Sequence, residues 1–250
     1  MNILLVDAGN TRIKWALADT AAAPGHWLAH GAVLHAELAT LTDAWRDLGA
    51  TCALVSNVAG AALRLQLAEL LSPLSVTWFA SMPALAGITN GYRDPSQLGC
   101  DRFAAAIGAR ALHPGRPLVV ATCGTATTID AISANGVFIG GMILPGLALM
   151  AGALANNTAQ LPQVQAGAAL PATFASNTMD AIVSGCINAQ AGAIERAVAA
   201  HAGACCIVSG GAAGYIVPAL AIPHTVRANL VLAGLHAAAS ALSQQGELSC

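Results

Sequence analysis

The sequence predicts a duplicated α/β protein in which mixed sheets are flanked by helices. Two stretches predict it. LVDAGNT at 5–11 and VVATCGTATTID at 119–130 are apolar runs that lead into a small-residue turn, and Gly9 aligns with Gly124. A similar order of strands and helices follows each stretch, which supports a duplication more strongly than the short match alone.

The halves are predicted to be two domains, 1–115 and 116–250. HPGRP at 113–117 is the best linker because proline and glycine interrupt regular structure there. The final helix of the second half is a candidate to pack back on the first domain.

Hydrophobic periodicity predicts the elements of the first half. The run at 2–7 is a buried strand, and the alternation of 12–19 indicates a half-buried antiparallel strand across the turn. The remaining predictions are helices at 37–48, 61–71 and 100–112, strands at 52–58 and 74–80, and a loop at 87–99.

The second half repeats the strand, turn and strand arrangement over 117–132 and adds a buried strand at 136–144. The region 204–220 has the pattern of a strand, a glycine-rich turn and the start of a helix. Helical spacing predicts three further helices, at 145–157, 178–203 and 227–242.

Composition excludes several classes of protein. The chain of 250 residues has only 9% charged residues and a net charge of -2, so no basic surface predicts nucleic-acid binding. The apolar stretch 137–155 is long enough for a membrane span, but Gly140, Gly141 and Pro145 interrupt it and neither end has a flanking Lys or Arg. We therefore expect no membrane partner and a cytoplasmic location, since the first residues also lack the basic region of a signal peptide.

The two glycine turns are candidate phosphate sites. Neither a Walker A motif nor GxGxxG after a strand is present, which disfavours P-loop kinases and Rossmann dehydrogenases. A glycine turn between strands lets backbone N–H groups approach an anion. Asp7 beside the first turn is a natural holder of Mg²⁺, directly or through water. The alternative is an ordinary turn in which Asp7 caps its own loop.

A second constellation is GYRDPSQLGCDR, which ends at the first turn of the helix predicted over 100–112. Asp101 there has two interpretations. It either caps the helix, because carboxylates are favoured at a helix N-terminus, or accepts a proton from a substrate hydroxyl. Arg102 could bind a carboxylate or hold Asp101 in place.

These motifs together resemble the type III pantothenate kinases. LVDAGNTRIKWAL, GCDR, CGTATTID, GGMILPGLALM and LVLAGL carry the resemblance, which runs from residue 3 to about residue 235. The family belongs to the acetate kinase, sugar kinase and actin superfamily. The resemblance implies two ribonuclease-H-like domains, as in actin-like ATPases, with ATP in the cleft between them. It also implies transfer of the γ-phosphate of ATP to the 4′-hydroxyl of pantothenate, the first step of coenzyme A biosynthesis.

The resemblance assigns roles residue by residue. It implies that Asp101 is the catalytic proton acceptor and that Asp7 belongs to the first phosphate hairpin, where we expect it to hold Mg²⁺ through water. The pantothenate pocket is lined by Tyr92, Gly99, Arg102 and Thr178. ATP and its phosphates are bound by Asp7, Gly9, Asn10, Thr11, Lys14, Gly124 and Thr125, with Gly210 and Gly211 matching a turn near the adenosine more loosely. Family members are typically dimeric, so we expect a homodimer.

One position departs from the family pattern. Many members have an aspartate two residues before the second glycine, where it helps bind a monovalent cation such as K⁺ or NH₄⁺, and this sequence has Thr122. A neutral hydroxyl binds K⁺ far more weakly than a carboxylate does. We therefore expect either little dependence on K⁺ or NH₄⁺, or binding of these cations through other oxygens with weaker affinity.

Two other functions stay open from the sequence. The first is a kinase of the same superfamily with another small-molecule acceptor. The second is a non-enzymatic accessory regulator of transcription, as some relatives were first described. The presence of both Asp7 and Asp101 and the lack of a basic face argue against the second.

Overall fold

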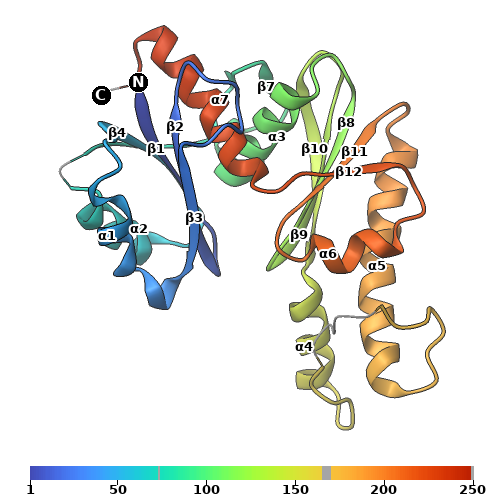
Figure 1. Cartoon of the computed structure of the whole chain (residues 1–250). Helices are drawn as coiled ribbons and strands as arrows, with labels where there is room; N and C mark the ends of the chain where they lie inside the picture. The colour runs from blue at the N-terminus through green and yellow to red at the C-terminus, as the bar shows by residue number, and fades with distance from the viewer. Residues whose placement is uncertain (73, 165–169, 249–250) are drawn as a thin grey trace. The chain divides into compact units, whose positions relative to one another are not determined.

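The computed structural model describes residues 1–72, 74–164 and 170–248 (Figure 1). The chain divides into two units, which are described separately. Unit 1 contains Met1–Gly115, Gly136–Phe138 and the chain from Asn229 onward, so the C-terminal helix belongs with the N-terminal sheet. Unit 2 contains Arg116–Asn135 and Ile139–Ala228.

A five-stranded sheet of order β3-β2-β1-β4-β5 forms the centre of unit 1. The strands β1 and β2 are an antiparallel hairpin, whereas β4 lies parallel to β1 on its other side and β5 lies parallel to β4. The bounds are β1 Asn2–Ala8, β2 Arg12–Asp19, β3 Ala29–Leu34, β4 Cys52–Asn57 and β5 Ser75–Trp78.

Helices cover both faces of this sheet. One face packs on α1 (Thr40–Arg46) and α2 (Ala61–Leu70) through side chains such as Trp15 and Trp45, which meet edge to face. The other face packs on α3 (Cys100–Leu112) and α7 (Leu230–Gln245). These two helices approach closely, because a Cβ on Gly234 would lie 1.7 Å from the carbonyl oxygen of Ala104.

Unit 1 also contains short elements between β5 and α3. The strands β6 (Ala84–Leu85) and β7 (Ile88–Asn90) form a small hairpin, and β7 pairs in parallel with the first residues of β10 (Val137–Pro145). The 3₁₀ helices are η1 His35–Glu37 and η2 Pro95–Gln97 in unit 1, and η3 Val217–Ala219 in unit 2.

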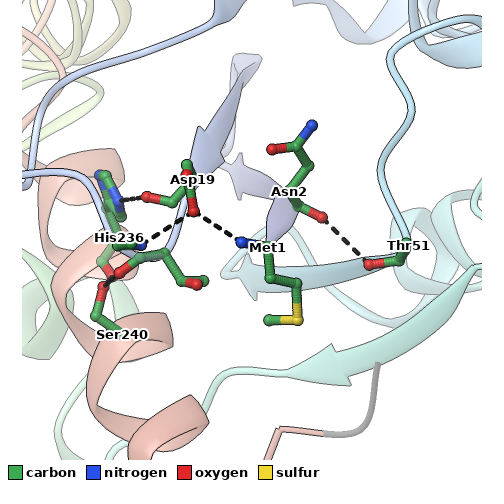
Figure 2. Close-up of polar contacts among 8 residues, drawn as sticks. Met1, Asn2, Asp19, Thr51, His236 and Ser240 are labelled. Atoms are coloured by element: carbon green, nitrogen blue, oxygen red, sulfur yellow. Dashed lines mark hydrogen bonds and ion pairs between the residues drawn. The ribbon is translucent and has the colours of Figure 1, made fainter.

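Polar contacts attach α7 to the end of the first hairpin (Figure 2). A ring nitrogen of His236, which is fully buried, lies 2.9 Å from the carbonyl oxygen of Asp19, and Ser240 Oγ donates to the carbonyl of Thr20. The Asp19 carboxylate accepts from the amino group of Met1 at 2.7 Å. Burial lowers the pKa of His236, so the neutral imidazole that fits this contact is the favoured form.

Unit 2 contains the strands β12, β11, β8, β9 and β10 in that order. The strands β8 and β9 form the second hairpin, and β11 lies parallel to β8. Helices α4, α5 and α6 pack on one face around an apolar core. The bounds are β8 Leu118–Cys123, β9 Ala126–Ile132, β10 Val137–Pro145, β11 Cys205–Ser209, β12 His224–Val226, α4 Leu147–Asn157, α5 Thr178–Ala200 and α6 Ala213–Ile216.

Two burial predictions were wrong. The alternation over 12–19 placed Ala16 with Arg12 and Lys14 on the less buried side of a half-buried strand, but Ala16 is fully buried, because α7 covers this face of β2. The strand predicted at 136–144 was expected to be buried, yet Ile139 and Ile143 in β10 are 53% and 66% exposed. Within the described ranges, no helix is both long and apolar enough to cross a bilayer. Cys100, Cys123, Cys186, Cys205 and Cys206 are free thiols, and Cys52 is disulfide-bonded.

Candidate functional site

The first hairpin places an acid and a base opposite each other. Asp7 on β1 and Lys14 on β2 are directly paired across the strands. The turn between them is closed by the Gly9 N–H, which donates to the carbonyl of Arg12 at 3.1 Å, and it exposes Asn10 and Thr11. All the residues predicted for the first phosphate turn therefore lie at one end of this hairpin.

Asp7 lies in a row of polar residues across three strands. Its partner on β4 is Ser56, so the row runs Lys14, Asp7, Ser56 over β2, β1 and β4. Residues paired directly across strands point to the same face of a sheet, which here is the face covered by α3 and α7. Burial raises the pKa of Asp7 from 3.8 to about 7; Lys14 opposes this rise and Asp101 adds to it.

Asp101 is brought to this row by the first turn of α3. The thiol of Cys100, the first residue of α3, lies 3.3 Å from the Ser56 hydroxyl. Burial raises the pKa of Asp101, while hydrogen bonding from the Arg102 N–H and the Arg102 charge oppose the rise. Asp7 and Asp101 are therefore two partly buried carboxylates from different elements, and the charge on Asp101 contributes to the raised pKa of Asp7.

Gly99 is required by the position of Asp101. A Cβ on Gly99 would lie 2.7 Å from Asp101 Oδ1, so any other residue would displace this carboxylate or the turn that holds it. The sequence motif thus has a steric explanation: the glycine makes room for the acid that follows two residues later.

Arg102 forms the adjoining part of the site. Its side chain is only 7% exposed, and Nη1 donates to the Tyr92 hydroxyl at 2.9 Å. The guanidinium also lies over the rings of Tyr92 and Phe138, which meet edge to face. Tyr92, Gly99, Asp101 and Arg102 are therefore neighbours in unit 1, and the rigid guanidinium is suited to a carboxylate ligand.

The second hairpin, formed by β8 and β9 in unit 2 and called hairpin two, has polar residues at the corresponding row of positions, but none of them is charged. Its turn is closed by the Gly124 N–H, which donates to the carbonyl of Ala126 at 3.0 Å. Across β9, β8 and β11 the row runs Thr128, Thr122, Ser209, which matches Lys14, Asp7, Ser56 strand by strand. The hydroxyls of Thr122 and Thr128 are buried with no hydrogen-bond partner among the described residues.

The turn of hairpin two lies against two glycines. A Cβ on Gly146 would lie 2.1 Å from the carbonyl oxygen of Gly124, and one on Gly210 would lie 2.1 Å from that of Cys123. Gly124 also borders a cavity of about 330 Å³ within unit 2. The cavity is lined chiefly by apolar side chains, among them Leu147, Val164, Ile187 and Tyr215.

Thr178, the other residue predicted for the pantothenate pocket, belongs to unit 2. It is exposed at the first position of α5 in unit 2, directly after the N-cap Asn177, whose side chain accepts from the Asp180 N–H.

Among the described residues, no group of three or more His, Cys, Asp or Glu side chains could hold a metal ion. A metal at this site would therefore depend on one or two carboxylates together with the phosphates of a ligand, as is usual for Mg²⁺.

Residues 3–200 match the family model for type III pantothenate kinase. The chain belongs to this family. A type III pantothenate kinase of Herminiimonas arsenicoxydans is 57% identical over 250 residues, which cover 95% of this chain and 97% of that protein. One of Aromatoleum aromaticum is 48% identical over 239 residues, with coverage of 93% and 96%. The predicted family and its kinase activity are thereby confirmed.

Solved structures confirm the fold class. A Campylobacter jejuni protein described as a Baf family transcriptional activator superposes with a TM-score of 0.62 at 22% identity, covering 98% of this chain and all of that one. The activator of 2-hydroxyisocaproyl-CoA dehydratase from Clostridium difficile, with bound ADPNP, gives a TM-score of 0.57 at 14% identity, covering 100% and 99% of the two chains. At these identities the similarity concerns the fold alone. It does not support the alternative function of a non-enzymatic regulator of transcription.

Sequence reasoning missed several residues that build the site. Ser56 completes the polar row, Phe138 supports Arg102, and His35 places a ring nitrogen 2.8 Å from the carbonyl oxygen of Gly9. None carries a local motif. The one available signal was Ser56, a polar residue at the end of an apolar strand.

Asp7→Asn is expected to stabilise the metal-free protein at alkaline pH. Because the pKa of Asp7 is raised, the folded state retains a proton that the unfolded chain has released, and stability falls as the pH rises from about 4 to about 7. An asparagine side chain cannot ionise, so the variant should be more stable than the wild type by up to roughly 4 kcal/mol at pH 8, with the difference shrinking toward pH 4. Urea unfolding in EDTA at both pH values measures it.

The matched control is Asp47→Asn, an exposed aspartate in the same unit, which should leave the pH dependence unchanged. If Asp7→Asn unfolded at lower urea than the wild type at pH 8, Asp7 would be a structural residue instead.

Proposed function

We propose that this pantothenate kinase transfers the γ-phosphoryl group of ATP to the 4′-hydroxyl of pantothenate, with Asp101 as the proton acceptor. The observation that carries the proposal is the pair of partly buried carboxylates, Asp7 and Asp101, in one chain of this family. The acceptor oxygen forms a bond to Pγ as the bond from Pγ to the bridging oxygen breaks and ADP leaves. The hydroxyl proton passes to Asp101.

Asp101 is suited to this role because its environment favours the protonated form more than water does. A base whose pKa lies closer to the working pH removes a proton more effectively. Its neighbours Tyr92, Gly99 and Arg102 would bind pantothenate, with the buried guanidinium of Arg102 pairing with the substrate carboxylate. Thr178 in unit 2 is kept as a proposed pantothenate-binding residue on the family resemblance alone.

Asp7 is proposed to hold Mg²⁺ through water. The residues fit a magnesium ion, because a carboxylate whose burial disfavours its own charge gains from a cation, and Mg²⁺ prefers oxygen ligands and keeps several waters. When bound, the ion would neutralise charge on the β- and γ-phosphates. Gly9, Asn10, Thr11 and Lys14 would bind phosphate oxygens beside it.

Hairpin two is proposed to bind the nucleotide through Gly124 and Thr125. The cavity next to Gly124 has the size and apolar lining of a small-molecule site, which supports placing the base of ATP there. The turn at Gly210 and Gly211 lies beside this hairpin, because the Ala212 N–H donates to the carbonyl of Cys123.

Asp101→Asn should fold normally and lose kcat by roughly 10²–10⁴-fold, because the amide cannot accept the hydroxyl proton. A coupled assay of ADP release with and without pantothenate measures this, and a panel of other hydroxyl acceptors tests the substrate. Wild-type turnover in the variant would remove Asp101 from the mechanism. Turnover confined to another acceptor would overturn the assignment of pantothenate.

We propose that turnover depends little on K⁺ or NH₄⁺. At about 4 Å and an effective dielectric constant near 20, a carboxylate attracts a monovalent cation by roughly 4 kcal/mol before desolvation, and the Thr122 hydroxyl lacks most of this. Turnover in Tris-only buffer should therefore change little when KCl is added at constant ionic strength. Thr122→Asp should instead make turnover respond to KCl.

A large activation of the wild type that saturates at low millimolar K⁺ would contradict this proposal. In that case another oxygen ligand must supply the missing charge.

We propose that the protein is a homodimer with β10 and α4 of unit 2 at the contact. Side chains of Ile139, Met142, Ile143, Leu149 and Leu154 are all more than a third exposed. Pairing of β10 with β7 ends at Phe138, so the strand beyond it offers an apolar surface to a second copy. The net charge of -2 leaves little repulsion between copies.

Sedimentation equilibrium should give the mass of a dimer for the wild type at micromolar concentration. Ile143→Glu places a charge in the proposed contact and should give a monomer, whereas Leu65→Glu, on the exposed face of α2, should not. A monomeric wild type would refute the contact.

A further inference from the structure

A buried amide in unit 2 has no role in the chemistry proposed above. Gln190 lies in the middle of α5 and is fully buried, between apolar neighbours such as Ile187 and Ile194 on the same face of the helix. An amide without hydrogen bonds is costly to bury, so an aliphatic residue would be the simpler choice for packing alone.

The amide of Gln190 joins two separate segments. Thr127 Oγ1 on β9 donates to Gln190 Oε1 at 2.7 Å, and Gln190 Nε2 donates to the carbonyl of Pro145 at 3.0 Å. Gln190 Nε2 also lies 3.4 Å from the sulfur of Met150 in α4. The acceptor on one side and the donor on the other fix the orientation of the amide.

Both segments meet at the turn of hairpin two. Thr127, which is fully buried, follows the turn residue Thr125 by two positions. On the other side, Gly146 directly follows Pro145, and its N–H donates to the carbonyl of Thr125 at 2.9 Å. The two ends of the Gln190 amide are therefore attached to both segments that determine where Gly124 and Thr125 lie.

We infer that Gln190 is a positioning residue for the nucleotide-binding turn of hairpin two. It acts through Thr127 and Pro145 and touches neither substrate. This inference rests on the proposed function, in which Gly124 and Thr125 bind the nucleotide. Loss of the amide should weaken nucleotide binding while the pantothenate pocket, which is built mainly on α3 and Tyr92, is unaffected.

Gln190→Met tests the inference, because methionine retains the length and volume but removes both hydrogen bonds. We expect the KM for ATP and the Kd for ADP to rise by about tenfold, with the KM for pantothenate within about twofold of the wild type. The matched control is Asn188→Met. Asn188 is an exposed amide on the same helix, and its Nδ2 donates to the carbonyl of Ser184. This variant should change neither the KM for ATP nor the Kd for ADP.

Thr127→Val supplies a second variant that keeps the shape and removes one hydroxyl. It should also raise the Kd for ADP. In the double variant with Gln190→Met, the fold-increase in this Kd should be smaller than the product of the two single fold-increases. Thermal unfolding of each variant establishes that it is folded, and if Gln190→Met does not fold, Thr127→Val decides alone.

Unchanged ADP and ATP constants in a folded Gln190→Met or Thr127→Val variant would overturn the inference and make the amide a packing residue only. Calorimetric ADP binding does not require an acceptor, so it separates the two proposals. A wild type that binds ADP but does not phosphorylate pantothenate would refute the proposed function and leave the inference standing.

Discussion

The burial of the Asp7 carboxylate beside Asp101 is the constraint on which the organisation of unit 1 depends. Burial disfavours the charge on Asp7, and Asp101 disfavours it further, so the metal-free protein retains a destabilising pair of acids. Several features keep the pair together: the parallel pairing of β1 with β4, the contact of Cys100 with Ser56 and the absence of a side chain on Gly99. Such strain is reasonable where a cation and a substrate hydroxyl complete the site.

The two hairpins have different proposed roles in binding. They share a backbone plan, as the strand-by-strand match of Lys14, Asp7, Ser56 with Thr128, Thr122, Ser209 demonstrates. The charged pair of the first hairpin is replaced as a pair, acid and base together, by two threonines in the second. A lone aspartate at 122 would face Thr128 instead of a lysine, so omission of the acid is consistent with omission of the base. Hairpin two instead depends on neutral contacts, from Gly146, Gly210 and the Gln190 amide.

Much of the fold could be predicted from local sequence, because the hairpins and α3 have strong periodicity and clear turn residues. The strand β2 and the helix α3 have the predicted bounds, 12–19 and 100–112. Burial was harder to predict, since Ala16 is covered by a helix more than 200 residues later and the apolar strand β10 leaves Ile139 and Ile143 exposed. Ser56, Phe138 and Gln190 were missed for the same reason, because each is defined by a tertiary partner and not by neighbours in sequence.

The titration of the Asp7 carboxyl group tests the central claim most directly. Carbon-detected NMR of the metal-free wild type should give an apparent pKa near 7 for Asp7. The pKa of Asp7 should be lower in Asp101→Asn than in the wild type, because the neighbouring negative charge is gone. It should also be lower in the wild type with Mg²⁺ and ADP than in the metal-free wild type. An Asp7 that titrates near its ordinary value of 3.8 in the metal-free wild type, with no response to Asp101→Asn, would contradict the account.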